Sequence, residues 1–394
     1  MNILFLTYDF PYPTTSGGKT RAYNLLKFAK KNANIFLFSF LRDSFRKEHT
    51  EEIKKLGVDV VATFPRKRLF DVRNLTSFLT KKSLLSSLYF DQKVSKKLFE
   101  VVQSKKIDLV HFESFYTGFY INDQLRSLGV KQVYGSENVE YRLYEDQAAY
   151  EPSIVKKLFF SGEVAKLQSE EQHFYKTADS VLTVTKSEAK YVESITKKPC
   201  IVIPNGVDSE YFSHKKAVSE KKALLFIGNF SYFPNVDAIT HFMTDIFPLL
   251  PDTATLLVVG KGAENLSILQ QERVSVLPFI KDIKDAYAQA EVFISPMRVG
   301  GGTNFKVLEA MACGVPVVAL SQRVKDFGFI DGKELLIAET AEAFAEKISR
   351  LLLNKKEQNI LAQTAREVVL KEYNWKAIGE SLAKAWKQTF DEKH

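Results

Sequence analysis

The amino-acid sequence predicts an α/β protein with two Rossmann-like, doubly wound domains that face each other across a cleft. Its 394 residues are enough for two domains of ordinary size. Short apolar runs alternate with helix-spaced patterns along the chain, which is typical of βαβ units and parallel sheets. The two halves also open alike, each with a strand, a turn rich in glycine or proline, and a helix.

The N-terminal domain is predicted to span residues 1–205 and to hold one sheet. Its strands are expected at residues 3–6, 35–40, 58–63, 107–112, 130–134 and 181–184. The first strand leads through a turn at Gly17 and Gly18 into the first helix. Ligands of such sheets bind beyond the carboxyl ends of the strands, so the segments that follow the strands are expected to carry function.

The C-terminal domain is predicted to span residues 206–375, with a polar, lysine-rich linker at 213–222. Its strands are expected at residues 224–227, 255–259, 274–277, 292–294, 315–319 and 335–337. The last helix, about residues 376–390, has Ile378, Leu382 and Trp386 at helical spacing. It therefore needs an apolar surface to pack against, on either domain.

Composition excludes several classes of protein. Hydrophobic residues make up 45% of the chain and charged residues 26%, as in ordinary globular proteins. The two cysteines, Cys200 and Cys313, lack a zinc-site spacing, so we expect neither a disulfide framework nor a metal ion. No apolar run approaches about 18 residues, and residues 1–10 lack a basic leader. We therefore expect a cytoplasmic protein whose membrane contacts are peripheral.

The net charge of +8 is concentrated in one segment. Between Arg42 and Lys106 there are 16 Lys and Arg against 8 Asp and Glu, and 16 − 8 = +8, so the rest of the chain is neutral in sum. No nucleic-acid recognition motif accompanies these residues. An anionic membrane surface, at the inner face of the cell membrane, or a phosphate-bearing acceptor would attract them. The alternative is that Lys81, Lys82, Lys96 and Lys97 belong to solvated helix faces.

The most informative segment is residues 295–320. Three glycines, Gly300 to Gly302, follow a predicted strand, and a helix is expected to start near Thr303. Glycines allow close approach of an anion, and free N–H groups at a helix start bind phosphate. Lys306 and Glu309 lie three residues apart and hence on one helix face, where they suit a diphosphate and ribose hydroxyls. The alternative is an ordinary exposed Lys–Glu pair.

Residues 301–318, GGTNFKVLEAMACGVPVV, resemble the donor-binding signature of the glycogen-synthase-like, group 1 (family 4 type) glycosyltransferases of the GT-B fold. Other segments resemble the same family in the same order. They are the Gly17-Gly18 loop, residues 136–141 (SENVEY), 178–182 (ADSVL), 203–208 (IPNGVD), and 226–231 (FIGNFS) followed by 234–237 (PNVD). The resemblance thus covers nearly the whole chain.

This resemblance implies a retaining glycosyltransferase that moves a hexose-type sugar from a nucleoside-diphosphate sugar to a glycan or lipid-linked acceptor, in the synthesis of cell-surface polysaccharide or glycoconjugate. It implies a donor-binding C-terminal domain, and a last helix, 376–394, that packs back on the acceptor-binding N-terminal domain. The donor is a substrate, and no cofactor or metal is expected. The implied donor-binding residues are Gly17, Gly18, Asn229, Phe279, Ile280, Gly301, Gly302, Thr303, Asn304 and Glu309.

The chain departs from the family pattern at three places. Gly301 takes the place of the first glutamate of an E-x7-E pair whose second member matches Glu309, and Asn229 and Phe230 stand where many members have Arg and Lys. The nearest cations that could neutralise a diphosphate are Arg298 and Lys306, which are therefore predicted as catalytic.

Glu137 is the third departure, because many members have histidine there. It is predicted as a catalytic base or sugar ligand, and the alternative is that it caps the next helix. His111 and Glu113, at a predicted strand end, are weaker candidates that suit packing as well. Rival functions are a nucleotide-sugar epimerase, an inactive GT-B subunit and a two-domain sugar-binding protein.

Overall fold

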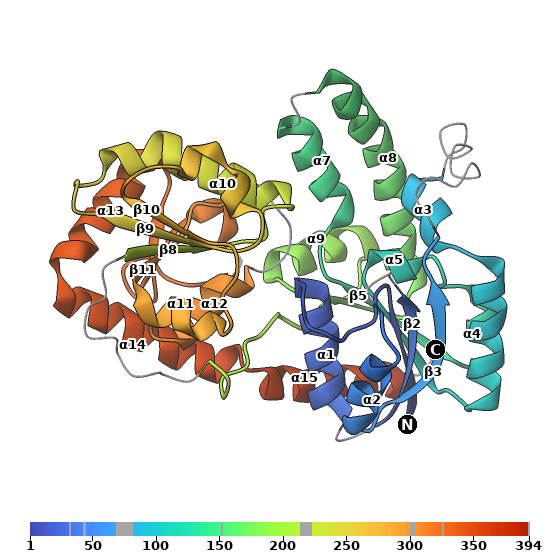
Figure 1. Ribbon diagram of the computed structural model, residues 1–394. Coiled ribbons are helices and arrows are strands. Elements are labelled where there is room, and N and C mark those ends of the chain that lie inside the picture. Colours follow the sequence, from blue (N-terminus) through green and yellow to red (C-terminus); the bar gives the residue numbers. More distant parts are fainter. Residues whose placement is uncertain are drawn as a thin grey trace. The chain divides into compact units, whose positions relative to one another are not determined.

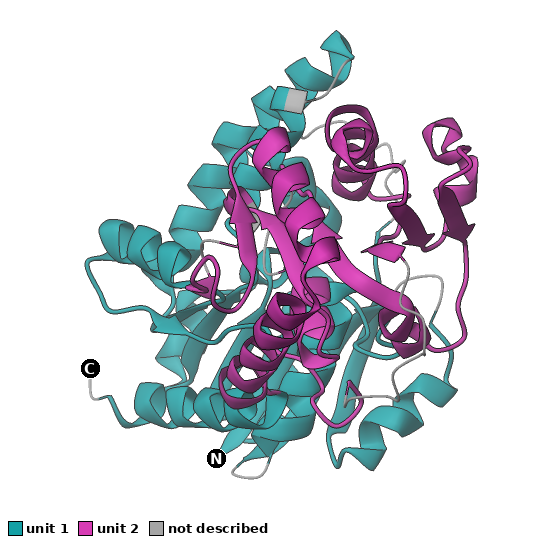
Figure 2. Cartoon of the chain, turned by 90° about the vertical axis from the view of Figure 1, so that its left-hand side faces the viewer, with its two compact units in different colours: residues 1–205, 375–394 teal, residues 206–374 magenta. Residues whose placement is uncertain are grey.

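The computed structural model describes residues 1–30, 33–41, 45–67, 82–150, 153–212, 223–299, 304–324 and 327–392 (Figure 1). The chain divides into two compact units (Figure 2). Unit 1 comprises residues 1–205 and 375–394, and unit 2 comprises residues 206–374. The predicted linker at 213–222 lies outside the described residues.

The described part of unit 1 contains a parallel sheet of seven strands in the order β3-β2-β1-β4-β5-β6-β7. The strands are β1 (Asn2–Thr7), β2 (Asn34–Leu41), β3 (Asp59–Pro65), β4 (Leu109–Glu113), β5 (Lys131–Ser136), β6 (Ser180–Thr183) and β7 (Ile201–Val202). In register, Phe5 of β1 lies between Leu37 of β2 and His111 of β4. The strand order reverses direction between β1 and β4, which makes their carboxyl ends the topological switch point.

Helices connect the strands of unit 1, as parallel pairing requires. They are α1 (Gly17–Ala29), α2 (Glu48–Lys55), α3 (Leu84–Tyr89), α4 (Gln92–Ser104), α5 (Phe115–Gly118), α6 (Asp123–Ser127), α7 (Glu140–Tyr150), α8 (Ile154–Thr177) and α9 (Lys186–Thr196). The last helix, α15 (Trp375–Asp391), also belongs to unit 1 and packs on α1. Gly379 permits this packing, because a Cβ there would lie 2.5 Å from the Cβ of Phe28.

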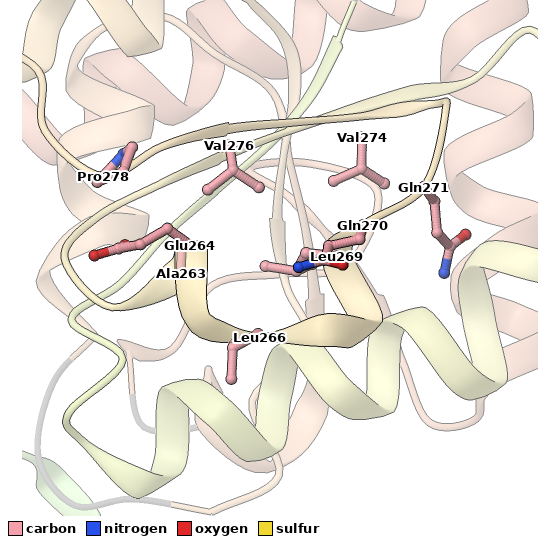
Figure 3. Close-up of a pocket in the computed structure, with 9 residues that line it drawn as sticks. All are labelled: Ala263, Glu264, Leu266, Leu269, Gln270, Gln271, Val274, Val276 and Pro278. Carbon is pink, nitrogen blue, oxygen red and sulfur yellow. The ribbon is translucent and has the colours of Figure 1, made fainter.

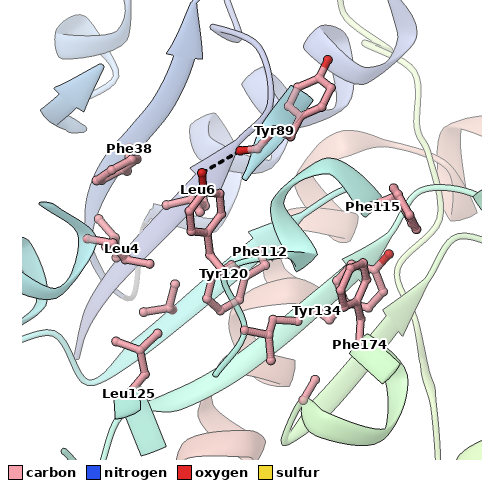
Figure 4. Packing of buried hydrophobic residues seen from close by; sticks show 14 of the residues in the cluster. Leu4, Leu6, Phe38, Tyr89, Phe112, Phe115, Tyr120, Leu125, Tyr134 and Phe174 are labelled. Carbon is pink, nitrogen blue, oxygen red and sulfur yellow. Dashed lines mark hydrogen bonds between the residues drawn. The ribbon is translucent and has the colours of Figure 1, made fainter. Parts of the chain in front are cut away.

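The core of unit 1 is rich in aromatic side chains (Figure 4). Phe112 of β4 and Tyr134 of β5 lie in it with Phe174 of α8, and the rings of Tyr134 and Phe174 are 5.8 Å apart. The buried hydroxyl of Tyr120 donates a 2.6 Å hydrogen bond to the carbonyl of Tyr89, so this ring is buried without an unpaired polar atom.

Unit 2 is a second parallel sheet flanked by helices. Its described strands, in the order β10-β9-β8-β11-β12-β13, are β8 (Ala223–Ile227), β9 (Thr255–Val259), β10 (Val274–Leu277), β11 (Ala290–Ser295), β12 (Val317–Leu320) and β13 (Leu336–Ala338). The α-helices are α10 (Phe233–His241), α11 (Ile283–Gln289), α12 (Phe305–Ala312), α13 (Ala341–Leu353) and α14 (Lys355–Glu372). A π-helical turn, Phe242–Ile246, extends α10, and short 3₁₀ turns include Ala263–Asn265 and Ser267–Leu269. Here the switch point lies between β8 and β11.

Three expectations need correction. Residues 201 and 202 form β7, a strand too short to leave an apolar pattern. Gly17 and Gly18 are the first residues of α1 rather than a loop before it, since the chain turns helical directly after the extended Ser16. Helix α12 starts at Phe305, two residues later than expected, with Asn304 before it.

Candidate functional site

The candidate donor site lies at the switch point of unit 2. Asn229 follows β8, Arg298 follows β11, and Lys306 stands in the first turn of α12. These residues are 69 and 8 positions apart in the chain (298 − 229 and 306 − 298), and the sheet order brings the strands that precede them together. The topology therefore gathers the residues that the sequence predicted separately.

Asn235, in the first turn of α10, connects these segments. Its side-chain oxygen accepts a 3.1 Å hydrogen bond from the Nζ of Lys306, and its Nδ2 donates a 2.8 Å bond to the carbonyl of Asn229. Gly228 leaves room for this side chain, because a Cβ at residue 228 would lie 3.0 Å from the Asn235 side chain, closer than most such contacts. The lysine is thus held toward the end of β8 by a neutral amide rather than by a carboxylate. Burial lowers the pKa of Lys306 to about 8, although the charge of Glu309 opposes this shift.

Glu309 is held by a tyrosine of the neighbouring helix. The hydroxyl of Tyr287, in α11, donates a 2.8 Å hydrogen bond to Glu309 Oε2. Burial raises the pKa of Glu309 to about 7, while the Tyr287 hydrogen bond and the Lys306 charge act in the opposite direction. The alternative, an ordinary exposed Lys–Glu pair, is therefore wrong: both side chains are partly buried, and each has a partner from another helix.

Arg298 is fixed by an aspartate of α10. Its Nη2 and Nε donate to the two carboxylate oxygens of Asp237 at 2.6 and 3.2 Å, a bidentate geometry that orients the guanidinium plane. Asn304, before α12, donates a 2.9 Å hydrogen bond from Nδ2 to the hydroxyl of Ser295 at the end of β11. Arg298 is thereby connected to α10, and Asn304 is connected to β11.

Phe279 and Ile280 follow the edge strand β10 and are not joined to Lys306 or Glu309 by any hydrogen bond among the described residues. Phe279 is 81% exposed, whereas Ile280 packs on the core cluster that contains Tyr287. Pro278, directly before them, closes one end of a cavity of about 510 Å³ (Figure 3). The cavity lies between β10 and the 3₁₀ turns, and its apolar wall includes Leu266 and Val276. Phe279 is not among the residues that line this cavity, but its exposed ring is suited to stacking on a planar base.

Three predicted donor-binding residues, Gly301, Gly302 and Thr303, lie outside the described residues, as does Gly300. Within the described part of the chain, no three His, Cys, Asp or Glu side chains gather in a way that could hold a metal ion.

In unit 1, Gly18 and Glu137 come together at the switch-point edge of the sheet. A Cβ on Gly18 would lie 2.3 Å from the Tyr8 hydroxyl and 3.3 Å from Glu137 Oε2, so glycine lets α1 approach both side chains. Glu137 Oε1 is buried and accepts no hydrogen bond among the described residues. Burial, together with the negative charge of Glu113, raises the pKa of Glu137 to about 8.

Glu137 does not cap the helix that follows it, so that alternative is wrong. The carboxyl group at the start of α7 is that of Glu171, from α8, whose Oε1 accepts a 2.9 Å hydrogen bond from the backbone N–H of Glu140. The Glu137 carboxyl therefore has no capping role at α7.

A buried polar network stands beside Glu137. Arg21 of α1 donates from Nε to Glu113 Oε1 at 2.6 Å, and from Nη1 to the side chain of Asn205 at 2.9 Å. The other oxygen of Glu113 is 2.6 Å from His111 Nε2, and His111 Nδ1 accepts a 2.8 Å hydrogen bond from the indole of Trp386 in α15. His111 and Glu113 thus hold the unit together, and neither is exposed for chemistry.

Sequence reasoning missed Arg21, Asn235, Asp237 and Tyr287 as parts of these sites. Asn235 and Asp237 carried a detectable signal, because they follow a proline at the start of a predicted helix, where polar side chains reach a switch point. Tyr287 carried no detectable sequence signal, since one aromatic residue on an amphipathic helix is indistinguishable from a core residue.

Two family models match the chain. Residues 221–354 match "Glycosyl transferases group 1", and residues 47–211 match "Glycosyltransferase Family 4". Together they cover most of both units.

Similar proteins and structures agree with these matches. A Klebsiella pneumoniae protein named "Uncharacterized 44.6 kDa protein in cps region" is 23% identical over 97% of this chain and 99% of its own length. A GDP-mannose-dependent phosphatidylinositol monomannoside mannosyltransferase of Mycolicibacterium smegmatis is 23% identical over 46% of this chain and 54% of its own. The structure of sucrose-phosphate synthase from Thermosynechococcus elongatus superposes with a TM-score of 0.71 at 18% identity, covering 99% of both chains.

Proposed function

The chain is a group 1 glycosyltransferase with the GT-B fold, and from that premise we propose that it transfers a hexose from a nucleoside-diphosphate sugar to a glycan or lipid-linked acceptor with retention of configuration. The observation that carries this proposal is the pairing of Lys306 with Asn235 and of Glu309 with Tyr287 at the start of α12. It places one cation and one carboxylate, both oriented by neutral partners, at the switch point where ligands of such sheets bind.

The proposed roles of the site residues in unit 2 follow from the charges of their side chains and of the reacting donor. Cleaving the bond to the sugar leaves a negative diphosphate, so positive groups near it lower the barrier. Lys306 and Arg298 supply that charge, and the N-terminal end of α12 adds the positive end of its dipole. Glu309 suits the ribose hydroxyls, because a carboxylate accepts two hydrogen bonds side by side. Phe279 offers its exposed ring to the base.

In unit 1 we propose that Glu137 is a sugar ligand rather than a general base. A carboxyl whose pKa is about 8 keeps its proton at neutral pH, so its O–H donates a hydrogen bond to a sugar oxygen and does not take up a proton. This role suits a position where many family members have histidine, which can also donate.

We further propose that the protein works in the cytoplasm, with peripheral contact to an anionic membrane, in the synthesis of a cell-surface polysaccharide or glycoconjugate. Among the described residues, no helix has both the length and the apolar character needed to span a bilayer. The basic segment from Arg42 to Lys106 supports surface attraction, although Lys54, Lys55, Lys67 and Lys97 are each paired with a carboxylate. Lys81 lies outside the described residues.

One experiment tests the proposed reaction. The purified protein is incubated with UDP-, GDP- and ADP-hexoses and candidate acceptors, and release of nucleoside diphosphate is followed together with the anomeric configuration of the product by NMR. Retained configuration in a new glycosidic bond is expected. Inverted configuration would contradict the stereochemical part, and interconversion of two nucleotide sugars without transfer would establish the epimerase alternative.

A further inference from the structure

The turn that follows β9 lies directly against the end of β8. It consists of Gly260, Lys261 and Gly262, and both glycines have a positive φ, 139° and 91°. A Cβ on Gly260 would lie only 1.8 Å from the carbonyl oxygen of Gly228, so only glycine allows this close packing. The backbone N–H of Phe230 also donates a 2.9 Å hydrogen bond to the carbonyl of Lys261. The backbone of Lys261 is therefore fixed beside the end of β8.

This position belongs to the candidate donor site. In the sheet, β9 lies between β10 and β8. A donor whose base lies at Phe279, after β10, and whose diphosphate lies at Lys306, in α12, has to pass the carboxyl ends of β9 and β8. At the end of β8, Asn229 is in turn joined through Asn235 to Lys306. Lys261 therefore stands on the path of the donor.

The charges described so far at this edge of the sheet cancel one another. Arg298 makes a bidentate ion pair with Asp237, which offsets its positive charge. Lys306 shares one face of α12 with Glu309. When these two cations and two carboxylates are all ionised, their charges sum to zero. A diphosphate is a polyanion, and it needs a further cation when it leaves water for such a site.

Lys261 is a cation of this kind. Its side chain is exposed, and it forms no ion pair with a carboxylate in the part of the chain that the structure describes. The nearby Glu264 accepts a 2.9 Å hydrogen bond from the backbone N–H of Gly262 instead. Lys281 is exposed as well, but it follows the edge strand β10, so β9 separates it from β8. The ammonium group of Lys261 can thus donate to phosphate oxygens without first leaving a partner.

We propose that Nζ of Lys261 binds the diphosphate of the sugar donor and stabilises it as the leaving group. The inference rests on the proposed glycosyl transfer and deepens it, because it adds a cation from the turn after β9 to those near α12. Negative charge on the diphosphate grows as the bond to the sugar breaks, so a cation beside it affects turnover as well as affinity.

Calorimetric titration of UDP, GDP and ADP into the full chain tests Lys261, and the nucleotide that wild type binds is the probe. Lys261→Met is expected to bind it about tenfold more weakly, the loss typical of a hydrogen bond to a charged group. Lys261→Arg keeps the charge and should bind more tightly than Lys261→Met. The matched control is Lys356→Met, at an exposed lysine in the first turn of α14, and it should bind like wild type. The neighbouring Lys355 binds Glu291 near the start of β11, so this control lies at the opposite edge of the sheet.

A second probe separates charge from the shape of the turn. The nucleoside of the same base lacks both phosphates, and competition titration should give it equal affinity for wild type and Lys261→Met. For the nucleotide, the difference in affinity between the two proteins should shrink as salt is added, because salt screens an exposed charge.

The outcomes distinguish this inference from the proposed function. If wild type and Lys261→Met bind the nucleotide equally well, the inference is wrong and the proposed function stands. A loss in Lys281→Met in place of Lys261→Met would assign the cation to the segment after β10 and refute the inference. Equal losses of nucleoside and nucleotide in Lys261→Met would refute it too, because they would show a changed turn. Wild type that binds none of the three nucleotides would overturn the proposed function, and the inference with it.

Discussion

The hydroxyl of Tyr287 and Oε2 of Glu309 form a 2.8 Å hydrogen bond that joins α11 to the helix carrying the donor-site lysine. The sequence motif predicted Glu309 as a site residue, yet the orientation of its side chain depends on a tyrosine 22 residues earlier in the chain. The bond also keeps the pKa of Glu309 lower than burial alone would set it.

Tyr287→Phe is therefore expected to weaken nucleotide binding by about tenfold, the loss typical of a hydrogen bond to a charged group. The freed carboxyl loses its orientation, and its pKa rises further. Isothermal titration calorimetry with nucleoside diphosphates measures the effect. The control is Tyr373→Phe, which removes a hydroxyl that donates to the Phe327 carbonyl in the same unit. Equal loss in both variants would show that general loosening of unit 2, and not Glu309, is responsible.

Arg21→Met is expected to destabilise unit 1 by about 3 to 5 kcal/mol, because it leaves the buried Glu113 carboxylate without its cation. Urea unfolding followed by circular dichroism measures this change. Lys54→Met removes an exposed ion pair with Glu51 and should cost less than about 1 kcal/mol. A similar loss in the two variants would contradict the structural role of the Arg21 network.

The stability of the protein is expected to fall as pH rises from about 5 to about 8. Burial raises the pKa of Glu171 to about 8 and that of Glu140 to about 7, so the folded chain holds protons that the unfolded chain releases. Each such carboxyl contributes a slope of up to about 1.4 kcal/mol per pH unit between its unfolded and folded pKa.

Glu171→Gln should flatten that dependence, since the amide keeps a hydrogen-bond acceptor for the N–H of Glu140 and cannot ionise. Unfolding free energies measured across this pH range check the prediction. Glu100→Gln, at an exposed pair with Lys97, is the control and should leave the slope as it is. An unchanged slope in Glu171→Gln would refute the assignment.

Turnover is expected to survive EDTA. The cationic groups of the proposed site, Arg298 and Lys306, supply the positive charge that a metal ion supplies in other enzymes. Initial rates with and without EDTA, followed by addition of Mg²⁺ or Mn²⁺, measure the effect. Complete loss of activity that either metal restores would contradict this account of leaving-group stabilisation.

Local sequence patterns sufficed for most of the fold, because buried parallel strands leave short apolar runs and the helices between them leave a different period. Strand β7 was not predicted because a strand of two residues is too short to show a periodic pattern of apolar residues. At the site, the motif of α12 identified Lys306 and Glu309. Asn235, which lies 71 residues from Lys306, could not be paired with it, since only the order of the strands brings α10 and α12 together.

In unit 1 the same limit applies to the network of Arg21. Its partners Glu113 and Asn205 are 92 and 184 residues away, and a buried arginine on an amphipathic helix resembles a surface arginine in sequence. The nearness of Glu137 to Gly18 of α1 was equally out of reach, because the two residues are far apart in the chain.

The central claim is that α12 binds the nucleoside diphosphate of the donor, and calorimetric titration of UDP, GDP and ADP into wild type, Lys306→Ala and Glu309→Ala tests it most directly. Lys333→Ala, at an exposed lysine of unit 2, serves as the control. The account predicts that wild type and control bind at least one of these nucleotides, and that each site variant binds it about tenfold or more weakly while keeping its fold. If both site variants bind all three nucleotides as well as wild type does, the assignment of the donor site is wrong.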